Sequence, residues 1–234
     1  MSNGLSVIIL SKTASNLIPC VEAVRKNEPA ARITVIDDGV DWSATPWPDD
    51  GGENLPFEAL MGESPFVFAR NHNIGIQAAG DDDVVLLNDD ALLETPNGFS
   101  AMRYAAESHP NIGLISASTN LAGNPEQHRR RDIGFRVLER NTLGNSFPTV
   151  AFICVLIPRR TINLVGLLDE RFTAYGFEDN DYCRRVMLAG LQIAVHDGCF
   201  VDHSKLKSSF RGAPAAGGKL EDGRAIYLDK WGSM

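Results

Sequence analysis

The sequence has few cysteines and no long apolar run, and both absences exclude classes of protein. Its 234 residues include four cysteines, which are widely spaced and form no Cys-x-x-Cys pair. That spacing indicates neither a zinc site nor a disulfide framework. No apolar stretch approaches the roughly 20 residues that cross a bilayer, and the start, Met1–Gly4, lacks the basic and apolar regions of a signal peptide. We therefore expect a soluble, cytoplasmic protein with no integral membrane association.

Two nucleotide-binding fingerprints and a basic surface are also missing. The chain contains neither a Gly-x-x-x-x-Gly-Lys-Ser/Thr loop nor a Gly-x-Gly-x-x-Gly run, so neither a P-loop nor a dinucleotide fold is indicated. The formal net charge of −8 at pH 7 argues against a broad basic surface for nucleic acid or anionic lipid. Hydrophobic residues make up 44% of the chain, which is ordinary for a globular protein with a substantial core.

What is present is an alternation of strand-like and helix-like segments. We predict strands over 5–10, 33–36, 66–69, 84–87, 113–118, 150–157 and 191–195, and helices over 15–27, 72–79, 98–108 and 178–189. Ser15 is the expected cap of the first helix. Residues 42–65 and 120–145 are expected to be irregular, and 204–218 to be a mobile tail. Strands that interleave with helices predict an α/β fold with a central, mainly parallel sheet flanked by helices.

Three acidic clusters stand at the ends of predicted elements. They are Asp37-Asp38, Asn88-Asp89-Asp90, and Glu178-Asp179 with Asp181. We expect the first two to end neighbouring parallel strands and so to share one edge, where ligands bind in open α/β sheets. Carboxylates at that edge can hold a divalent cation, which in turn engages phosphates. The alternative is that the acids begin solvated loops or cap helices, since a carboxylate also favours a helix N-terminus.

Other charged and aromatic residues have simpler interpretations. We expect Asp81–Asp83 to be a solvated turn and Arg129–Arg131 a basic surface loop, with contact to an acidic acceptor as the alternative for the arginines. Trp42, Trp47 and Trp231 are as compatible with packing as with stacking on sugar rings.

Several segments carry a more specific pattern, in order along nearly the whole chain. They are Val7–Ser11 with Val35–Gly39, Arg70–Gly75 with Ala78–Gly80, Leu86–Asp90, Gly166–Phe172 with Tyr175–Arg185, Val201–His203 with Ser208-Ser209, and Tyr227 to Gly232. Together they resemble the family 2 inverting glycosyltransferases, which have the GT-A fold, and especially their rhamnosyltransferase-like members. Leu86–Asp90 resembles the family's DxD-type metal motif. Gly166–Arg185 is similar to its "G-x-x-D-E-x-F … Y-G-x-E-D-x-D-x-x-x-R" signature.

The resemblance implies a pocket for a nucleoside-diphosphate sugar donor. Ser11, Asp37 and Asp38 would line the nucleoside pocket. Arg70 and Asn73 would help to hold the same nucleotide.

The resemblance also implies a metal site at the donor diphosphate. Asp90 would coordinate Mn²⁺ or Mg²⁺ there, and Asp89 would lie near the ribose or the sugar. His203 would be a second metal ligand or a diphosphate contact. Because Asn88 replaces the first acid of a strict DxD, Asp90 is expected to carry most of the protein's metal coordination.

Asp179 would be the catalytic base, and Glu178 and Asp181 would shape the site around it. A sugar hydroxyl attacks well only as its proton is removed, so one positioned carboxylate is needed as general base. A cation neutralises the departing diphosphate, and attack opposite that group inverts the donor carbon in one displacement. We expect a hexosyltransferase-type enzyme that uses a UDP-sugar. Its acceptor hydroxyl stays open among saccharide, lipid-linked glycan, protein and modified nucleic acid.

We expect one domain over 1–234, in which 1–119 bind the nucleotide sugar and 120–234 form the acceptor and catalytic half. Two alternatives stay open. One is a nucleotide-sugar-binding protein without catalysis. The other is a sugar nucleotidyltransferase, although these usually carry a Gly-rich loop after the first strand, and Ser11–Ser15 contains no glycine.

Overall fold

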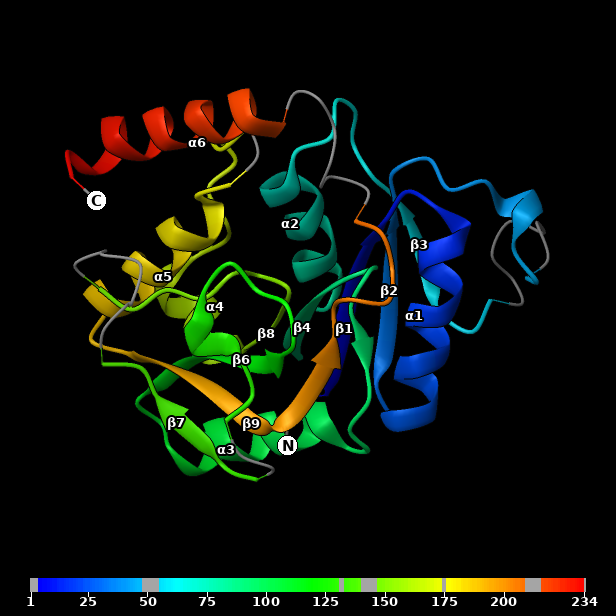
Figure 1. The fold of residues 1–234 in the computed structure, drawn as a ribbon, viewed down its shortest axis with the longest axis horizontal. Coiled ribbons are helices and arrows are strands. Elements are labelled where there is room, and N and C mark those ends of the chain that lie inside the picture. Colours follow the sequence, from blue (N-terminus) through cyan, green and yellow to red (C-terminus); the bar gives the residue numbers. More distant parts are fainter. Residues whose placement is uncertain are drawn as a thin grey trace.

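The centre of the fold is one mixed sheet with helices on both of its faces (Figure 1). The computed structural model describes residues 4–47, 55–130, 133–139, 147–173, 176–208 and 216–233. In spatial order the strands are β3 (Glu58–Met61), β2 (Arg32–Asp37), β1 (Leu5–Ser11), β4 (Asp83–Asn88), β8 (Cys154–Ile157), β6 (Ile112–Thr119), β9 (Gln192–Asp202) and β5 (Leu92–Leu93). The short strand β7 (Phe135–Val137) pairs with β9 outside this order.

The sheet is mainly parallel, as predicted. Strands β3, β2, β1 and β4 run parallel to their neighbours. Strand β8 is antiparallel to both β4 and β6, so β6 runs in the direction of β4, and β9 is parallel to β6. Strands of the two predicted halves of the chain interleave here, because β8 lies between β4 and β6.

The helices divide between the two faces and leave one helix outside. Helices α1 (Ala14–Asn27) and α3 (Gly98–Ser108) pack on one face. Helices α2 (Phe68–Ala78), α4 (Arg159–Val165) and α5 (Glu178–Leu188) pack on the other. Helix α6 (Ala216–Trp231) lies on the outside, beside α5 (Figure 1). Among the described residues, no helix has both the length and the apolar content needed to span a bilayer.

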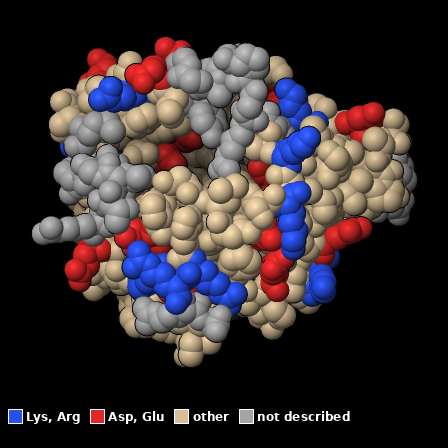
Figure 2. Space-filling model, in the orientation of Figure 1, with Lys and Arg blue, Asp and Glu red and all other residues tan. Residues whose placement is uncertain are grey.

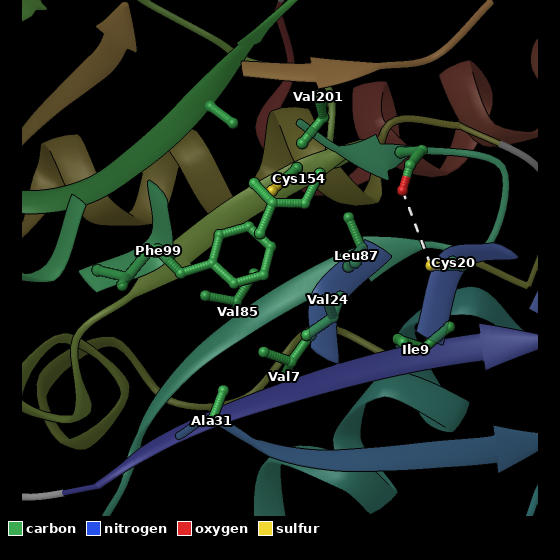
Figure 3. Close-up of a cluster of buried hydrophobic side chains, with 14 of the residues drawn as sticks. Val7, Ile9, Cys20, Val24, Ala31, Val85, Leu87, Phe99, Cys154 and Val201 are labelled. Atoms are coloured by element: carbon green, nitrogen blue, oxygen red, sulfur yellow. Dashed lines mark hydrogen bonds between the residues drawn. The ribbon is translucent and has the colours of Figure 1, made fainter. Parts of the chain in front are cut away.

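Alternating side chains of the buried strands feed two separate cores. Val7 and Ile9 of β1 face α1 and α3, and Ile8 faces α2 on the other side. Figure 3 shows the first core, in which Val7 lies near Val24 of α1, Ile9 near Cys20 of α1, and Val85 of β4 near Phe99 of α3. Each such side chain stabilises the fold by about 1.5–3 kcal/mol when it is fully buried. The strands are therefore held in place between the two helix layers, and the carboxyl ends of the parallel strands form one edge of the sheet.

Helix α2 approaches β1 closely, and one glycine makes this possible. A Cβ at Gly75 would lie 2.5 Å from Cγ2 of Ile8, closer than carbon atoms can pack. The predicted strand over 66–69 is wrong, because α2 begins at Phe68. Ala69, His72, Asn73 and Ile76 are buried, and their spacing of three and four residues is that of a helix face.

Strands β8 and β9 differ in extent from the predicted strands, because side chains from distant parts of the sequence bind polar groups there. Strand β8 covers only the second half of the predicted 150–157 strand, since the side chain of Gln127 takes both backbone groups of Ala151. Strand β9 continues past the polar His196-Asp197, because Arg136 pairs with the buried Asp197 (3.0 Å).

Some predicted loops contain regular structure. The irregular 42–65 and 120–145 segments include β3, β7 and the 3₁₀ turns Trp42–Ala44 and Pro125–Gln127. Residues 48–54, 131–132 and 140–146 lie outside the described residues. In the predicted mobile tail, α6 begins at Ala216, and 209–215 are not described. Ser15 is not the cap of α1, which has Thr13 at that position without a side-chain hydrogen bond.

The predicted solvated turn at 81–83 is wrong for two of its three acids. Asp82 accepts from the N–H of Gly4 (2.8 Å) and the hydroxyl of Ser6 (2.7 Å). Asp83 is buried and pairs with Arg103 (2.9 Å). These carboxylates anchor the first strand and the third helix at the edge of the sheet opposite the strand carboxyl ends.

Candidate active site

The carboxyl ends of three parallel strands bring the first two acidic clusters to one edge. Strand β1 lies between β2 and β4, and its last residue, Ser11, is in register with Asp37. Asp89 and Asp90 follow the end of β4. The clusters were predicted on neighbouring strands, which is wrong, because β1 separates β2 from β4. Their shared edge follows from the common direction of all three strands.

Asp89 is a buried carboxylate held by the first strand and helix. The hydroxyl of Ser11 donates to its Oδ2 (2.8 Å), and the amide of Asn16 donates to its Oδ1 (3.4 Å). Burial, together with the charge of Asp90, raises the pKa of Asp89 to about 6, although both hydrogen bonds favour the ionised form. Asn16 also donates to the carbonyl of Lys207 (3.0 Å). The Asn16 side chain thus links the segment after β9 to the Asp89 carboxylate.

Asp90 and His203 meet in the interior in a contact that needs a proton or a metal ion. The Nε2 of His203 lies 3.0 Å from Oδ1 of Asp90, and its Nδ1 lies 2.8 Å from the carbonyl oxygen of Leu121. A carbonyl oxygen only accepts hydrogen bonds, so Nδ1 carries a proton and donates it to Leu121. In the neutral ring, Nε2 then presents a lone pair to a carboxylate oxygen. A proton shared by the two atoms makes the contact favourable, and a metal ion held by both would do the same.

A divalent metal ion fits this pair of donors. Two ligands about 2.1 Å from an octahedral ion and at right angles to each other are about 3 Å apart, which is the spacing of Asp90 and His203. Imidazole nitrogen suits transition metals such as Mn²⁺ better than Mg²⁺, and the Leu121 carbonyl is the usual outer partner of a metal-binding histidine. Within the described residues, no group of three or more His, Cys, Asp or Glu side chains could hold a metal. The pair would therefore supply two ligands.

Asp37 and Asp38 differ in how their side chains are used. Oδ1 of Asp37 accepts from the backbone N–H groups of Gly39 and Val40 (2.8 and 2.7 Å). Its Oδ2 accepts from the indole N–H of Trp42 (2.7 Å). Asp38 is half-buried, and burial, together with the charge of Asp37, raises its pKa. The Asp37 carboxylate thus shapes the turn after β2, and nucleoside contacts by this pair stay a prediction.

Arg70 and Asn73, at the start of α2, hold neighbouring loops. The amide of Asn73 donates to the carbonyl of Leu168 and to Glu170 (both 2.9 Å), and its oxygen accepts from the N–H of Leu168 (3.0 Å). Arg70 pairs with Glu63 (3.2 Å). These contacts position the 168–170 loop and the segment before α2. The direct nucleotide contact predicted for both residues stays a prediction.

The third acidic cluster opens α5 after a strained turn. Phe177 has φ +73° and ψ −9°, in the left-handed region that costs a non-glycine residue about 1–2 kcal/mol. The next residue, Glu178, is buried, and its Oε2 has no hydrogen-bond partner among the described residues. Asp179 accepts from the backbone N–H of Asn180 (2.7 Å) and from that of Phe152.

The two adjacent carboxyls both have raised pKa values. Burial raises the pKa of Glu178, and the charge of Asp179 raises it further. Burial also raises the pKa of Asp179, although its backbone hydrogen bonds oppose the shift. Asp179 therefore satisfies a first-turn N–H, as in the capping alternative, and also has the raised basicity that a general base near neutral pH requires.

The side chain of Asp181 contacts residues other than Glu178 and Asp179. Its side chain has no exposed surface. Oδ1 accepts from the indole N–H of Trp231 (2.8 Å) and pairs with Lys230 (2.6 Å), and Oδ2 pairs with Arg185 (2.9 Å). We predicted that Asp181 shapes the site around Asp179, and that role stays a prediction. Its Oδ1 holds α6 against α5, and its Oδ2 is paired within α5.

One face of the molecule is hollowed near its centre (Figure 2). Figure 2 shows Asp and Glu side chains in and around the hollow, and a cluster of Lys and Arg side chains lower on the same face. Arg129 and Arg130 are exposed, as a surface loop predicts. Arg130 pairs with Glu126 (2.7 Å), and the Arg129 guanidinium lies 5.2 Å from the Phe200 ring centroid. Arg131 lies outside the described residues.

The tryptophans pack in the described structure. The Trp47 and Trp42 rings lie 5.0 and 6.2 Å from that of Phe57, and Trp231 lies 4.5 Å from the Arg184 guanidinium. This favours the packing interpretation over the sugar-stacking one.

Sequence reasoning missed two polar residues that support the site. Asn16 is buried beside Asp89. Its spacing of four from the buried Cys20 was an available signal, because it places an amide on the inner face of the helix. Gln127 is fully buried and donates to Ser116 (2.8 Å). No local pattern marks Gln127, since its partners are distant in sequence.

Comparison with known proteins places this chain among glycosyltransferases. The family model described as "Glycosyltransferase like family 2" matches residues 6–213. A protein of Sinorhizobium fredii (strain NBRC 101917 / NGR234), described as the uncharacterized protein y4gI, is 24% identical over 155 residues, which are 59% of this chain and 17% of that protein.

Solved structures share the fold at low identity. GalNAc-T7 with UDP, GalNAc and Mn²⁺ has a TM-score of 0.72 and 15% identity, over 98% of this chain and 48% of that one. TarS 1–349 of S. aureus has a TM-score of 0.63 and 12% identity, over 85% and 60% of the two chains. The mannosyltransferase PcManGT of Pyrobaculum calidifontis, with GDP-Man and Mn²⁺, has a TM-score of 0.63 and 14% identity, over 98% and 64%.

The chain thus spans less than two thirds of the length of each of these proteins. The structural likeness confirms the predicted GT-A fold. The rhamnosyltransferase-like subgroup stays a prediction. Because the family model covers most of its residues, the chain belongs to the glycosyltransferase like family 2.

Proposed function

We propose that the chain transfers a sugar from a nucleoside-diphosphate donor to an acceptor hydroxyl, with inversion and with the help of a divalent metal ion. The observation that carries the proposal is the buried contact of Asp90 with His203 at 3.0 Å. The Nδ1 of this histidine is hydrogen-bonded to the Leu121 carbonyl. This pair lies at the strand edge where ligands bind in α/β sheets. A bound Mn²⁺ or Mg²⁺ would supply positive charge to the leaving diphosphate.

The donor pocket is proposed to lie along the ends of β2, β1 and β4. Since both oxygens of Asp37 accept hydrogen bonds within its own turn, Asp38 is the better candidate for a nucleoside contact. Ser11 and Asp89, joined by a 2.8 Å hydrogen bond, would lie at the ribose or sugar. In this scheme residues 1–119 supply most donor contacts, and 120–234 supply the base and the acceptor side.

Asp179 is proposed as the general base. Its raised pKa gives it the basicity to accept a hydroxyl proton as the bond to the donor carbon forms. Burial raises the pKa of both carboxyls, and the charge of Asp179 raises that of Glu178 further, so the proposal keeps one proton on Glu178 and leaves Asp179 ionised. A protonated Glu178 can then donate a hydrogen bond from its otherwise unpartnered Oε2 to a substrate oxygen.

The proposed donor is a UDP-sugar. GalNAc-T7, which has the higher TM-score of the two metal-containing neighbours, was solved with UDP and Mn²⁺, and PcManGT with GDP-Man and Mn²⁺. Both support a nucleotide sugar with a divalent metal, and GDP-sugars are therefore the first alternative in the test.

The experiment is a donor screen that follows nucleoside-diphosphate release with Mn²⁺, with Mg²⁺ and with EDTA. We expect release from a UDP-sugar that depends on metal, and loss of turnover with retained donor binding in Asp179→Asn. Binding without turnover in the unaltered chain would favour the nucleotide-sugar-binding alternative. Pyrophosphate as product would establish a nucleotidyltransferase instead. If no nucleotide sugar is bound or cleaved under any metal condition, the proposal is wrong.

A further inference from the structure

The acidic turn at the start of α5 is held from outside by the last helix of the described chain. Helix α6 presents Tyr227, Lys230 and Trp231 to α5. Their spacing of three and four residues places them on one face of the helix. Tyr227 is almost fully buried there. In Figure 1, α6 runs along the outside of the fold beside α5.

The first contact supports the strained residue in front of the acids. The rings of Phe177 and Tyr227 lie 5.6 Å apart, within the range of favourable aromatic pairs. A Cβ at Gly176 would lie 2.7 Å from Cδ1 of Leu220, so α6 also packs directly on the residue before Phe177. A left-handed conformation at a phenylalanine persists only where its surroundings enforce it. Helix α6 supplies those surroundings.

The second contact is an ion-pair bridge centred on Lys230. Its Nζ lies 2.6 Å from Oδ1 of Asp181 and 2.6 Å from Oδ2 of Asp169. Asp181 is two residues after Asp179 in the first turn of α5, and Asp169 belongs to the preceding loop. Lys230 thus joins both ends of the segment that carries Glu178 and Asp179.

The third contact fixes the rotation of α5. Trp231 donates from its indole N–H to Asp181 (2.8 Å), and its ring lies 4.5 Å from the Arg184 guanidinium. Arg184 in turn donates to the hydroxyl of Tyr227 (3.2 Å) and to the carbonyl of Ser233 (2.8 Å). These contacts hold two successive turns of α5 to one surface of α6.

We propose that Lys230 and Trp231 are positioning residues, which hold the Glu178–Asp179 turn in the geometry needed for proton transfer. The inference rests on the proposed role of Asp179 as base. Neither residue touches the carboxyls of Glu178 or Asp179 in the contacts above, and both act through Asp181 and the α5 backbone. A small displacement of a base costs rate steeply, because proton transfer needs hydrogen-bond contact with the acceptor hydroxyl.

The test compares Lys230→Met and Trp231→Phe with a matched control. Arg103→Met is the control, because Arg103 also pairs with two carboxylates, Asp83 and Glu107, and is similarly buried. It lies on α3, away from the strand carboxyl ends. Trp231→Phe keeps a ring over Arg184 and removes only the donor to Asp181, so it covers the case in which Lys230→Met fails to fold.

We expect kcat to fall at least tenfold in Lys230→Met and severalfold in Trp231→Phe, with the donor dissociation constant within twofold of the unaltered chain. Lys230→Arg, which keeps the positive charge, should recover part of the loss. Arg103→Met should lower the melting temperature and leave kcat unchanged. Folded Lys230→Met and Trp231→Phe with unchanged kcat would overturn the inference, as would an equal loss of kcat in Arg103→Met.

Asp179→Asn, measured in the same series, separates this inference from the proposed function. If Asp179→Asn keeps full turnover, the proposed base is wrong. If Asp179→Asn is inactive while the α6 variants keep full kcat, the base stands and only the positioning role is lost.

Discussion

Replacing Gln127 by methionine tests whether one buried amide organises the loop beside the acidic turn. The amide donates to the Ser116 hydroxyl (2.8 Å) and the Ala151 carbonyl (2.9 Å), and it accepts from the N–H of Ala151 (2.7 Å). Methionine has nearly the same length, so the shape is kept while the hydrogen bonds are lost. Ser116 keeps its own bond to the Ala117 carbonyl (2.8 Å). The Ala151 carbonyl keeps its bond from the N–H of Ile153 (2.8 Å), so only the N–H of Ala151 is left unpaired.

Each unpaired buried backbone group costs about 1–3 kcal/mol. One such group is lost here, and the added apolar contact of methionine offsets part of its cost, so we expect a loss of about 1–2 kcal/mol in the free energy of unfolding. For a chain of this size, each kcal/mol shifts the melting temperature by about 2–4 °C, which predicts a decrease of about 2–8 °C. Urea denaturation followed by circular dichroism measures the first quantity, and a thermal scan measures the second.

The matched control is Gln77→Met, at an exposed position on α2, where a change within about 0.5 kcal/mol is expected. Because Ala151 precedes Phe152, whose N–H donates to Asp179, Gln127→Met should also lower kcat. A Gln127→Met protein as stable as Gln77→Met would refute the reasoning, since it would mean that the buried amide is dispensable.

Three further predictions concern the acids and the packing of α2. Burial raises the pKa of Asp179 above its ordinary value, so kcat/KM should fall about tenfold per pH unit once the pH drops below that raised pKa and the base is protonated; a pH profile that stays flat down to pH 4 would contradict this. Folding raises the pKa of Glu178 above its unfolded value, so the unaltered chain loses stability as pH rises from the unfolded pKa through the folded one. Glu178→Gln should therefore be more stable than the unaltered chain by about 1–3 kcal/mol at pH 9 and not at pH 4, and identical urea midpoints at both pH values would count against it. Gly75→Ala should cost about 1–3 kcal/mol from overpacking against Ile8, whereas Gly123→Ala, where an added Cβ meets nothing within 4 Å, should cost far less.

The sequence predicted the fold best where local pattern and burial agree. The strands around Val7 and Val85 and the helix over 98–108 lie where expected. A continuous apolar run and a helical spacing of apolar residues each predict one structure that buries those residues. Strands β3, β5 and β7 and helices α4 and α6 were missed. The three strands have only two to four residues, and their pairing with distant strands, rather than their own composition, forms them.

For the site, the sequence predicted the types of residue better than their partners. It selected Asp90 and His203, which are 113 positions apart, only through the family resemblance, since no local spacing joins them. Asp181 shows the opposite case. Its position in an acidic cluster predicted chemistry, but Lys230 and Trp231 engage it from 49 and 50 positions away, and only the folded chain reveals that.

The most direct test of the central claim is the Mn²⁺ dependence of nucleoside-diphosphate release from a UDP-sugar, measured for the unaltered chain and for Asp90→Asn and His203→Asn. The account predicts release that EDTA abolishes, and half-saturating Mn²⁺ concentrations raised at least tenfold in both variants. Gln77→Met should behave as the unaltered chain. Release that proceeds without metal, or a Mn²⁺ requirement that neither variant changes, would contradict the account.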